Sequence, residues 1–139
     1  MKKDPRHRAR EAALQILYFA EIGKTGAGAA LDTFFSEHQP DASDAVRTFA
    51  AELVNGTSSE LAALDEIIGR HSEHWRVERL AVIDRLILRL AIWELRHERE
   101  TPPAVVLNEA IELARRYGTD ESARFVNGVL DSVRKALDA

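Results

Sequence analysis

Apolar residues recur every three to four positions along most of the chain, and this spacing constrains the fold more than any other feature. The first such stretch has its apolar positions at Ala9, Ala12, Ala13, Ile16, Leu17 and Ala20. That period is typical of a helix with one buried face. Alternation of β-branched and polar residues, which would indicate strands, is nearly absent. The sequence therefore predicts an all-α protein.

Capping residues and helix breakers divide this pattern into about seven helices. Asp4 and Pro5 suit a first cap and a first helical position, and Gly118 followed by Thr119 suits the end of one helix and the start of the next. Asn55-Gly56 predicts a break or kink, with Thr57 capping the helix that follows. The expected helices cover about 5–23, 31–35, 43–54, 57–70, 79–98, 102–117 and from 119 onward. The segment 79–98 is apolar almost all round, so we expect it to be the central helix of a compact bundle.

The size and composition of the chain narrow its class. At 139 residues it fits one domain, or two tightly joined subdomains. It has no cysteine, which excludes disulfides, thiolate metal sites and cysteine nucleophiles. No apolar run approaches the roughly 18 residues that a bilayer requires, and no signal-type apolar core follows the N-terminus. We expect a cytoplasmic protein.

No arrangement in the sequence predicts an active site. His71 and His74 lack a clear third ligand for a metal ion. The segment Gly23-Lys24-Thr25 ends like a phosphate-binding loop, but Tyr18 stands where that motif needs glycine. No set of nucleophile, base and oxyanion donors can be assembled. We therefore expect a protein that is not an enzyme and that uses no metal and no cofactor.

Positive charge is concentrated at the N-terminus of an acidic protein. The chain has 19 Lys and Arg against 23 Asp and Glu, a net charge of −4. Its first ten residues have a net charge of +4 and the remainder −8, since one acid, Asp4, opposes five cations there: Lys2, Lys3, Arg6, Arg8 and Arg10. Cations are unfavourable at a helix N-terminus, whose exposed N–H groups already carry positive partial charge. Two interpretations stay open: a frayed, solvated terminus, or a site for nucleic-acid phosphates.

Two further features are compatible with binding. Phe125 lies about 100° from the centre of the apolar stripe of the last helix, next to Arg124. A half-exposed aromatic ring beside an arginine can stack on an unpaired base, although it can equally be packed at the edge of the core. Arg85, Arg89 and Arg96 share one face of the central helix, which predicts either a solvated face or a partner surface.

Four segments together resemble the NusB family of transcription antitermination factors. They are RHRAREAALQILY at 6–18, IDRLILRLAIWEL at 83–95, Pro103 with NEAIELARRYG at 108–118, and FVNGVLD at 125–131. The resemblance covers nearly the whole chain. It implies an all-α, NusB-like fold of two small helical subdomains, at about 1–75 and 76–139, within one domain at 1–139.

The resemblance also implies a function. NusB-like proteins pair with NusE, a small-subunit ribosomal protein, bind the single-stranded boxA element of ribosomal-operon RNA, and suppress termination within the RNA polymerase antitermination complex. They are not enzymes. The residues that fall on the family's RNA-binding segments are Arg6, Arg8, Arg10, Glu121 and Phe125, to which we add the neighbouring Lys2, Lys3 and Arg124. The residues that fall on the surface offered to NusE are Tyr18, Glu78, Asp84 and Arg89.

This chain departs from the family pattern at several places. Asp84 stands where glutamate is expected, which shortens any partner contact there. The segments 22–45 and 71–79 match poorly, so no role is assigned within them except that of Glu78. An alternative of another class stays open: a helical protein-interaction module, or a homodimer that hides its RNA face, because an apolar stripe on the first helix serves core and interface alike.

Overall fold

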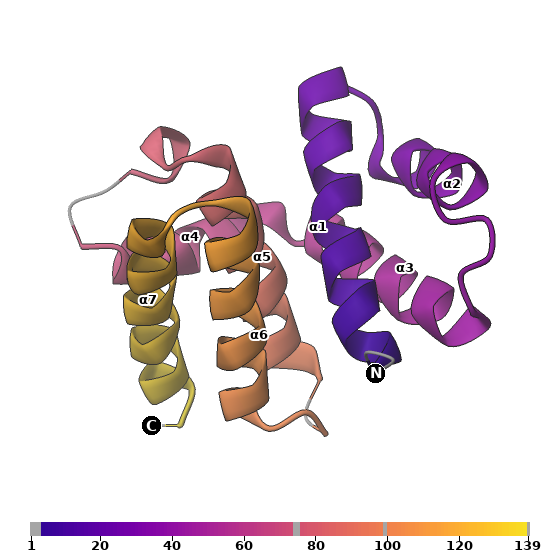
Figure 1. Cartoon of the computed structure of the whole chain (residues 1–139). Coiled ribbons are helices and arrows are strands. Elements are labelled where there is room, and N and C mark those ends of the chain that lie inside the picture. The colour runs from indigo at the N-terminus through magenta and orange to yellow at the C-terminus, as the bar shows by residue number, and fades with distance from the viewer. Residues whose placement is uncertain (1–3, 74–75, 99, 139) are drawn as a thin grey trace. The chain divides into compact units, whose positions relative to one another are not determined.

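The computed structural model describes residues 4–73, 76–98 and 100–138, and in these ranges every regular element is helical. Lys2 and Lys3 lie outside the described residues. The described residues form seven α-helices and one short 3₁₀ turn: α1 (Pro5–Gly23), α2 (Ala27–Glu37), α3 (Asp44–Ser59), α4 (Leu61–His71), η1 (Val77–Arg79), α5 (Val82–His97), α6 (Pro103–Tyr117) and α7 (Asp120–Asp138). The α-helices are labelled in Figure 1. The all-α prediction is confirmed. None of the helices in the described ranges is long and apolar enough to cross a membrane.

The first compact unit, Met1–Ser59, contains α1, α2 and α3. Asp4 caps α1 by accepting a hydrogen bond from the Arg6 backbone N–H at 2.8 Å, as the sequence predicts. The buried face of α1 packs against α3, whose Val46, Phe49 and Leu53 point inward. Phe34 and Phe35 bring α2 onto the same core, so the unit encloses one small apolar centre.

The connection between α2 and α3 is held by one arginine. Arg47 donates hydrogen bonds to the carbonyl oxygens of Pro40 at 2.6 Å, Ala42 at 3.0 Å and Gln39 at 3.4 Å. Its guanidinium also lies 5.2 Å from the centroid of the Phe35 ring. A side chain of α3 thus donates hydrogen bonds to carbonyl groups that lie outside the helices and accept no intrahelical hydrogen bond.

The second unit, Glu60–Ala139, is built around α5. This helix contacts α4, α6 and α7, and Leu88 and Ile92 are fully buried in it. Full burial of one such side chain contributes roughly 1.5–3 kcal/mol. The expectation that this segment forms a central buried helix is confirmed.

Ion pairs tie α4 to α5. The carboxylate of Glu60 accepts hydrogen bonds from Trp93 Nε1 at 3.1 Å and from an Arg96 terminal nitrogen at 3.2 Å, and His97 Nε2 lies 2.8 Å from its Oε2. The hydrogen bond with His97 is the largest of the causes that lower the pKa of Glu60 below its ordinary value. Glu60, which immediately precedes α4, is therefore fixed to the last turns of α5.

Several helix boundaries differ from the sequence-based expectation, including the start of α5, which lies at Val82 because residues 77–79 form the separate turn η1. Asn55-Gly56 does not break α3, which continues to Ser59, and Thr57 is fully buried within that helix rather than capping the next one. Burial of Leu53 and Val54 outweighs the cost of about 1 kcal/mol that an internal glycine carries. The second helix is also longer than expected, since it begins at Ala27 rather than near residue 31.

The division between the units falls between Ser59 and Glu60, whereas the expected boundary lay near residue 75. The reason is the packing of α4, which contacts α5, α7 and η1 of the second unit. The assignment of 1–139 to a single domain stays a prediction.

Candidate functional site

The arginines at the start of α1 differ in how far they reach solvent. Arg6 places its guanidinium carbon 4.4 Å from the centroid of the Phe49 ring, and that of Arg10 lies 5.6 Å from the same centroid. Arg10 is 7% exposed and Arg6 is partly buried, while Arg8 is exposed. The ring of Phe49 therefore supports two of the three arginines, each by a cation–π contact. Arg8 is the one most available to a ligand.

The electrostatics of this helix start favour an anion. No acidic residue lies in the first turn of α1, where the backbone N–H groups carry positive partial charge, although Asp4 caps the helix. Arg6 and Arg8 add cationic side chains to the same end. Because Pro5 has no N–H and Asp4 accepts the Arg6 and Arg8 N–H groups, a phosphate near Arg8 would be stabilised chiefly by the cationic side chains.

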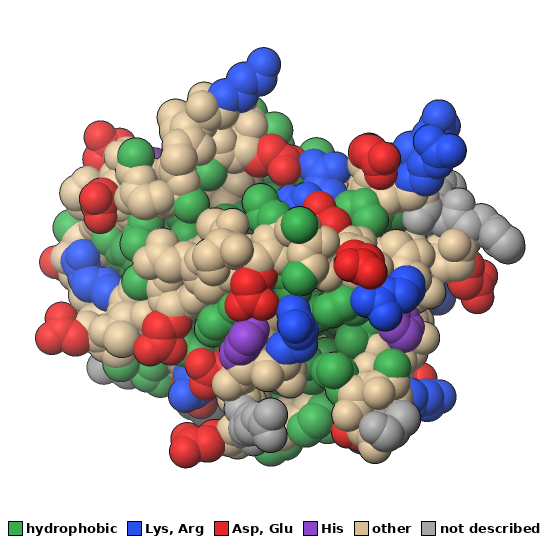
Figure 2. Space-filling view, turned by 180° about the vertical axis from the view of Figure 1, so that it is seen from behind, with side chains coloured by type: hydrophobic (Ala, Val, Ile, Leu, Met, Phe, Trp, Pro, Cys, Tyr) green, Lys and Arg blue, Asp and Glu red, His purple; other side chains and the backbone are tan. Residues whose placement is uncertain are grey.

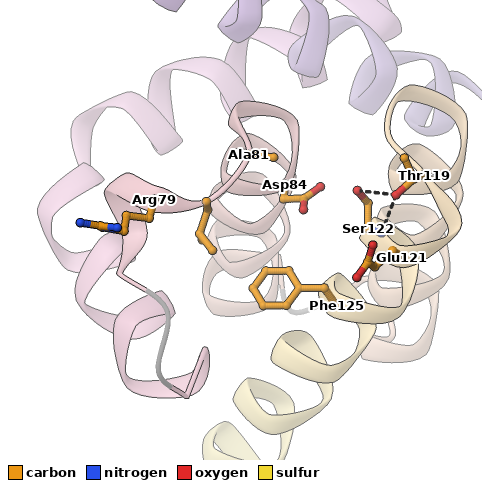
Figure 3. Close-up of a pocket in the computed structure, with 8 residues that line it drawn as sticks. Arg79, Ala81, Asp84, Thr119, Glu121, Ser122 and Phe125 are labelled. Carbon is orange, nitrogen blue, oxygen red and sulfur yellow. Dashed lines mark hydrogen bonds between the residues drawn. The ribbon is translucent and has the colours of Figure 1, made fainter.

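The second unit contains a hollow of about 260 Å³ where the start of α7 faces η1 and the first turn of α5. Figure 3 shows the Phe125 ring pointing into this hollow, whereas the Arg79 side chain extends away from Phe125. Its lining consists of Arg79, Leu80, Ala81, Asp84, Thr119, Glu121, Ser122 and Phe125. The sequence predicted that Phe125 is half-exposed, and the structure places it so.

The hollow owes its shape to the start of α7. Thr119 caps this helix, as predicted, because its Oγ1 accepts a hydrogen bond from the Ser122 backbone N–H at 3.0 Å. The Thr119 hydroxyl also donates to Ser122 Oγ at 3.3 Å, and Figure 3 draws both bonds. Gly118 ends α6 just before, and a Cβ there would come within 2.8 Å of the Ala114 carbonyl oxygen. Glycine therefore permits the tight turn that brings Ser122 to the rim.

Asp84 gives the hollow a buried acceptor. Its side chain is on the first turn of α5 and the residue is 9% exposed. Burial raises the pKa of this carboxyl above its ordinary value, and a hydrogen bond with Ser122 acts in the opposite direction. Its Oδ1 has no hydrogen-bond partner among the residues that the structure describes. This oxygen is itself buried, so the desolvation of the carboxylate is only partly offset by Ser122.

The four residues expected on a partner surface have unlike surroundings. Tyr18 is 37% exposed on α1, and Glu78 is exposed on η1. Asp84 is buried as described above. Arg89 donates two hydrogen bonds to the carboxylate of Asp65, at 2.7 and 2.8 Å, so it joins α5 to α4. Arg89 thus already has a partner within the second unit.

The structure brings some of the predicted residues together and leaves others apart. Glu121, Phe125 and Asp84 meet at one hollow, although the resemblance assigns the first two to RNA and the third to NusE. Arg124 is exposed outside the lining. The arginines at the start of α1 belong to the first unit. On the face drawn in Figure 2, acidic and basic side chains are interspersed with exposed hydrophobic ones.

Several relevant residues carry no signal in the sequence. From the sequence, Phe49 is predicted only to face the core from its helix. The contact of two arginines with its ring cannot be predicted from the sequence pattern. Ser122 and Arg79 at the hollow are likewise missed. The capping role of Thr119 could have drawn attention to Ser122, because a cap commonly pairs with the residue three positions later.

Comparison with known proteins gives a consistent result. The family model described as "NusB family" matches residues 7–135. A protein of Sorangium cellulosum named "Transcription antitermination protein NusB" is 48% identical over 132 residues, which cover 95% of this chain and 93% of that protein. A protein of the same name from Koribacter versatilis is 43% identical over 139 residues, covering 100% of this chain and 94% of the relative.

Solved structures agree in fold. NusB of T. maritima superposes with a TM-score of 0.88 at 36% identity, over 96% of this chain and 93% of that one. A structure described as "Crystal Structure of Antitermination Factors NusB and NusE in complex with dsRNA" gives a TM-score of 0.87 at 26% identity, over 95% and 97% of the two chains. The matched family model spans most of the described helices, from α1 to α7. The chain belongs to the NusB family.

Proposed function

We propose that this protein is an RNA-binding transcription antitermination factor that acts with NusE on the boxA element of ribosomal-operon RNA and thereby suppresses termination. The observation that carries the proposal is its membership of the NusB family, with a relative named as an antitermination protein at 48% identity. The protein acts by binding and not by catalysis, as part of the RNA polymerase antitermination complex in the cytoplasm. No cofactor is required.

RNA binding is proposed to start at α1. Arg8 neutralises a phosphate through its exposed side chain, while Phe49 holds Arg6 and Arg10 in position. Lys2 and Lys3, which lie outside the described residues, extend the same positive segment.

The hollow in the second unit is proposed to receive an unpaired base. The half-exposed ring of Phe125 offers a stacking face, a contact that contributes roughly 1–3 kcal/mol per base. Glu121 and Arg124 flank the ring on the exposed side of α7. The residues that recognise this base would therefore differ from the residues of α1 that bind phosphates.

NusE is proposed to bind through Tyr18 and Glu78, which are exposed, together with Asp84 and Arg89. Support comes from the solved NusB–NusE complex, which has the same fold. Because Arg89 is held by Asp65 and its side chain is 13% exposed, it would contribute to this surface by joining α5 to α4 rather than by offering an unpaired charge.

The first test is fluorescence anisotropy with a boxA-like single strand and a scrambled strand, each with and without NusE. We expect selective binding to the boxA strand that tightens when NusE is added. A duplex of the same sequence belongs in the series, since the solved relative holds double-stranded RNA. Weak binding that has the same affinity for every RNA and does not change when NusE is added would favour the protein-interaction module or the homodimer instead.

A charge variant tests the site itself. Arg8→Ala should weaken boxA binding and reduce the slope of log affinity against log salt by about 0.7, the value for one phosphate contact on a single strand. Arg70→Ala is the matched control, because Arg70 is an exposed arginine of α4 whose side chain is 65% exposed. If the salt dependence of RNA affinity is the same for Arg8→Ala and Arg70→Ala, phosphate does not bind at the start of α1.

A further inference from the structure

Arg79 is an exposed arginine of η1 whose charge no acidic side chain neutralises. Among the residues that the structure describes, its side chain makes no hydrogen bond, ion pair or ring contact. Acidic residues nevertheless outnumber basic ones in this unit, since residues 60–139 contain 15 of the 23 Asp and Glu and 12 of the 19 Lys and Arg. Arg89 of the same unit, by contrast, is bound to the carboxylate of Asp65. The charge of Arg79 is therefore available to an anionic ligand.

Arg79 also lines the hollow into which the Phe125 ring points. In Figure 3 its guanidinium is directed away from the ring, out of the hollow. The two carboxylates of the lining, Asp84 and Glu121, are drawn beside Ser122, on the side away from the arginine. The hollow thus has a cation at its η1 wall and negative charge at the Ser122 side. An anionic group that binds here is attracted to the first wall and repelled by the second.

A nucleotide matches this distribution of groups. Its base is flat and uncharged, and it can stack on the half-exposed ring of Phe125. The sugar joins the phosphate to the base, so the phosphate stays outside a hollow that holds the base. The guanidinium of Arg79 points to the outside of the hollow, and a guanidinium binds phosphate oxygens through two parallel hydrogen bonds.

We propose that Arg79 binds the phosphate of the nucleotide whose base stacks on Phe125, and that it thereby fixes the orientation of that nucleotide. This inference rests on the proposed function, which assigns a base to Phe125 but no phosphate to the second unit. The phosphate held by Arg79 is additional to the one assigned to Arg8. The arginine supplies salt-dependent affinity, and the ring supplies stacking.

The test is fluorescence anisotropy of the boxA-like strand with NusE present. Arg79→Ala should raise Kd about fivefold and lower the slope of log affinity against log salt by about 0.7, the value for one phosphate contact on a single strand. Arg79→Lys keeps the charge and should retain the slope. Arg134→Ala is the matched control and should change neither quantity. Arg134 also has no partner among the described residues, but it lies nine positions beyond Phe125 on α7 and outside the lining.

A double-mutant cycle distinguishes one shared nucleotide from two separate contacts. If Arg79 and Phe125 hold the same nucleotide, the variant with both changed to alanine should raise Kd by less than the product of the two single effects. Arg79→Ala with Arg8→Ala should give the full product, because these arginines are assigned to different phosphates. Thermal unfolding verifies that each variant is folded. If Phe125→Ala is not, Phe125→Leu takes its place, since it removes the stacking ring and keeps apolar volume.

The contrary results are distinguishable. If Phe125→Ala weakens RNA binding but Arg79→Ala leaves the salt slope unchanged, the inference is wrong and the proposed function stands. If the effects of the two substitutions multiply, Arg79 does not hold the nucleotide at the hollow. If Arg79→Ala weakens the binding of NusE in the absence of RNA, the arginine belongs to the protein interface instead. If the unmodified chain with NusE binds no RNA, the proposed function fails together with the inference.

Discussion

The arginines of α1 and the arginines of α5 are the same residue type on two helices, and they have opposite surroundings. Arg89 and Arg96 of α5 are paired with carboxylates of the second unit, Asp65 and Glu60. Arg6 and Arg10 of α1 rest on an aromatic ring, and Arg8 is exposed at a helix end that already carries positive partial charge. Arg89 and Arg96 stabilise the fold, whereas Arg8 opposes the dipole of its helix and exposes its charge to solvent.

Removing the Arg89 side chain should have the largest effect on stability. Arg89→Ala deletes two charge-assisted hydrogen bonds at a side chain that is 13% exposed, so we expect the free energy of unfolding to fall by about 2–3 kcal/mol. Urea denaturation measures this. The control is Arg70→Ala, whose pair with Glu66 is exposed and contributes less than about 0.5 kcal/mol. Equal losses for the two variants would remove the contrast between paired and solvated arginines.

Replacing the ring beneath Arg6 and Arg10 should have the next largest effect. Phe49→Leu keeps most of the buried volume but removes both cation–π contacts, and we expect a loss of about 1.5 kcal/mol in unfolding free energy. Under the proposed function it should also weaken RNA binding, because the arginines lose their support. Phe35→Leu, a change at another buried ring of the first unit, is the control for RNA binding. Unchanged RNA affinity in Phe49→Leu would mean that the ring serves the core alone.

Two carboxylates of the second unit should give opposite pH dependence. The pKa of Glu60 is lowered below 4.5, so its contribution to stability is present above that pH and is lost as the pH falls through the folded-state pKa. The pKa of Asp84 is raised above 3.8, so the folded protein loses stability as the pH rises from 3.8 through the higher folded-state pKa. Glu60→Gln should therefore flatten the acid limb of a stability profile. Asp84→Asn should raise the melting temperature at pH 7 by a few degrees and leave the acid limb in place.

Either substitution acting in the other direction would contradict these assignments. A lower melting temperature at pH 7 for Asp84→Asn would mean that the charged form of Asp84 is stabilised by a group other than Ser122. An unaltered acid limb in Glu60→Gln would mean that the link between α4 and α5 does not depend on this charge.

Removing Arg8 should have the smallest effect on stability, and with the opposite sign to Arg89. Arg8→Ala relieves an unfavourable cation near the N-terminus of α1 and introduces a better helix former, so we expect a gain of about 0.3–1 kcal/mol at low salt. Thermal unfolding at two salt concentrations measures it, and the gain should shrink at high salt. A loss of stability instead would show that Arg8 is anchored within the protein.

Much of the fold follows from local features of the sequence. Asp4 and Thr119 cap their helices as predicted, and Gly118 ends α6, because capping depends on neighbouring residues alone. The continuation of α3 through Asn55-Gly56 was not predictable in this way. Burial of Leu53 and Val54 decides it, and burial depends on the packing of other helices.

The candidate site shows the same division. The half-exposure of Phe125 follows from its position on a helical wheel. Asp84 faces the same hollow because of the way in which α5 packs against α7. No residue spacing in the sequence predicts this. The pairing of Arg89 with Asp65, 24 positions apart, is missed for the same reason. Contacts between distant segments are what separate a structural arginine from one that is available to a ligand.

The hydrogen bonds of Arg47 have a consequence for how the first unit opens. The Gln39–Ala42 connection contains proline and aspartate and would ordinarily be the point where a protease cuts. With three of its carbonyl groups bound by one guanidinium, the connection must break all of them to adopt the extended shape that a protease active site requires. Limited proteolysis should therefore spare this connection until α3, which carries Arg47, itself unfolds.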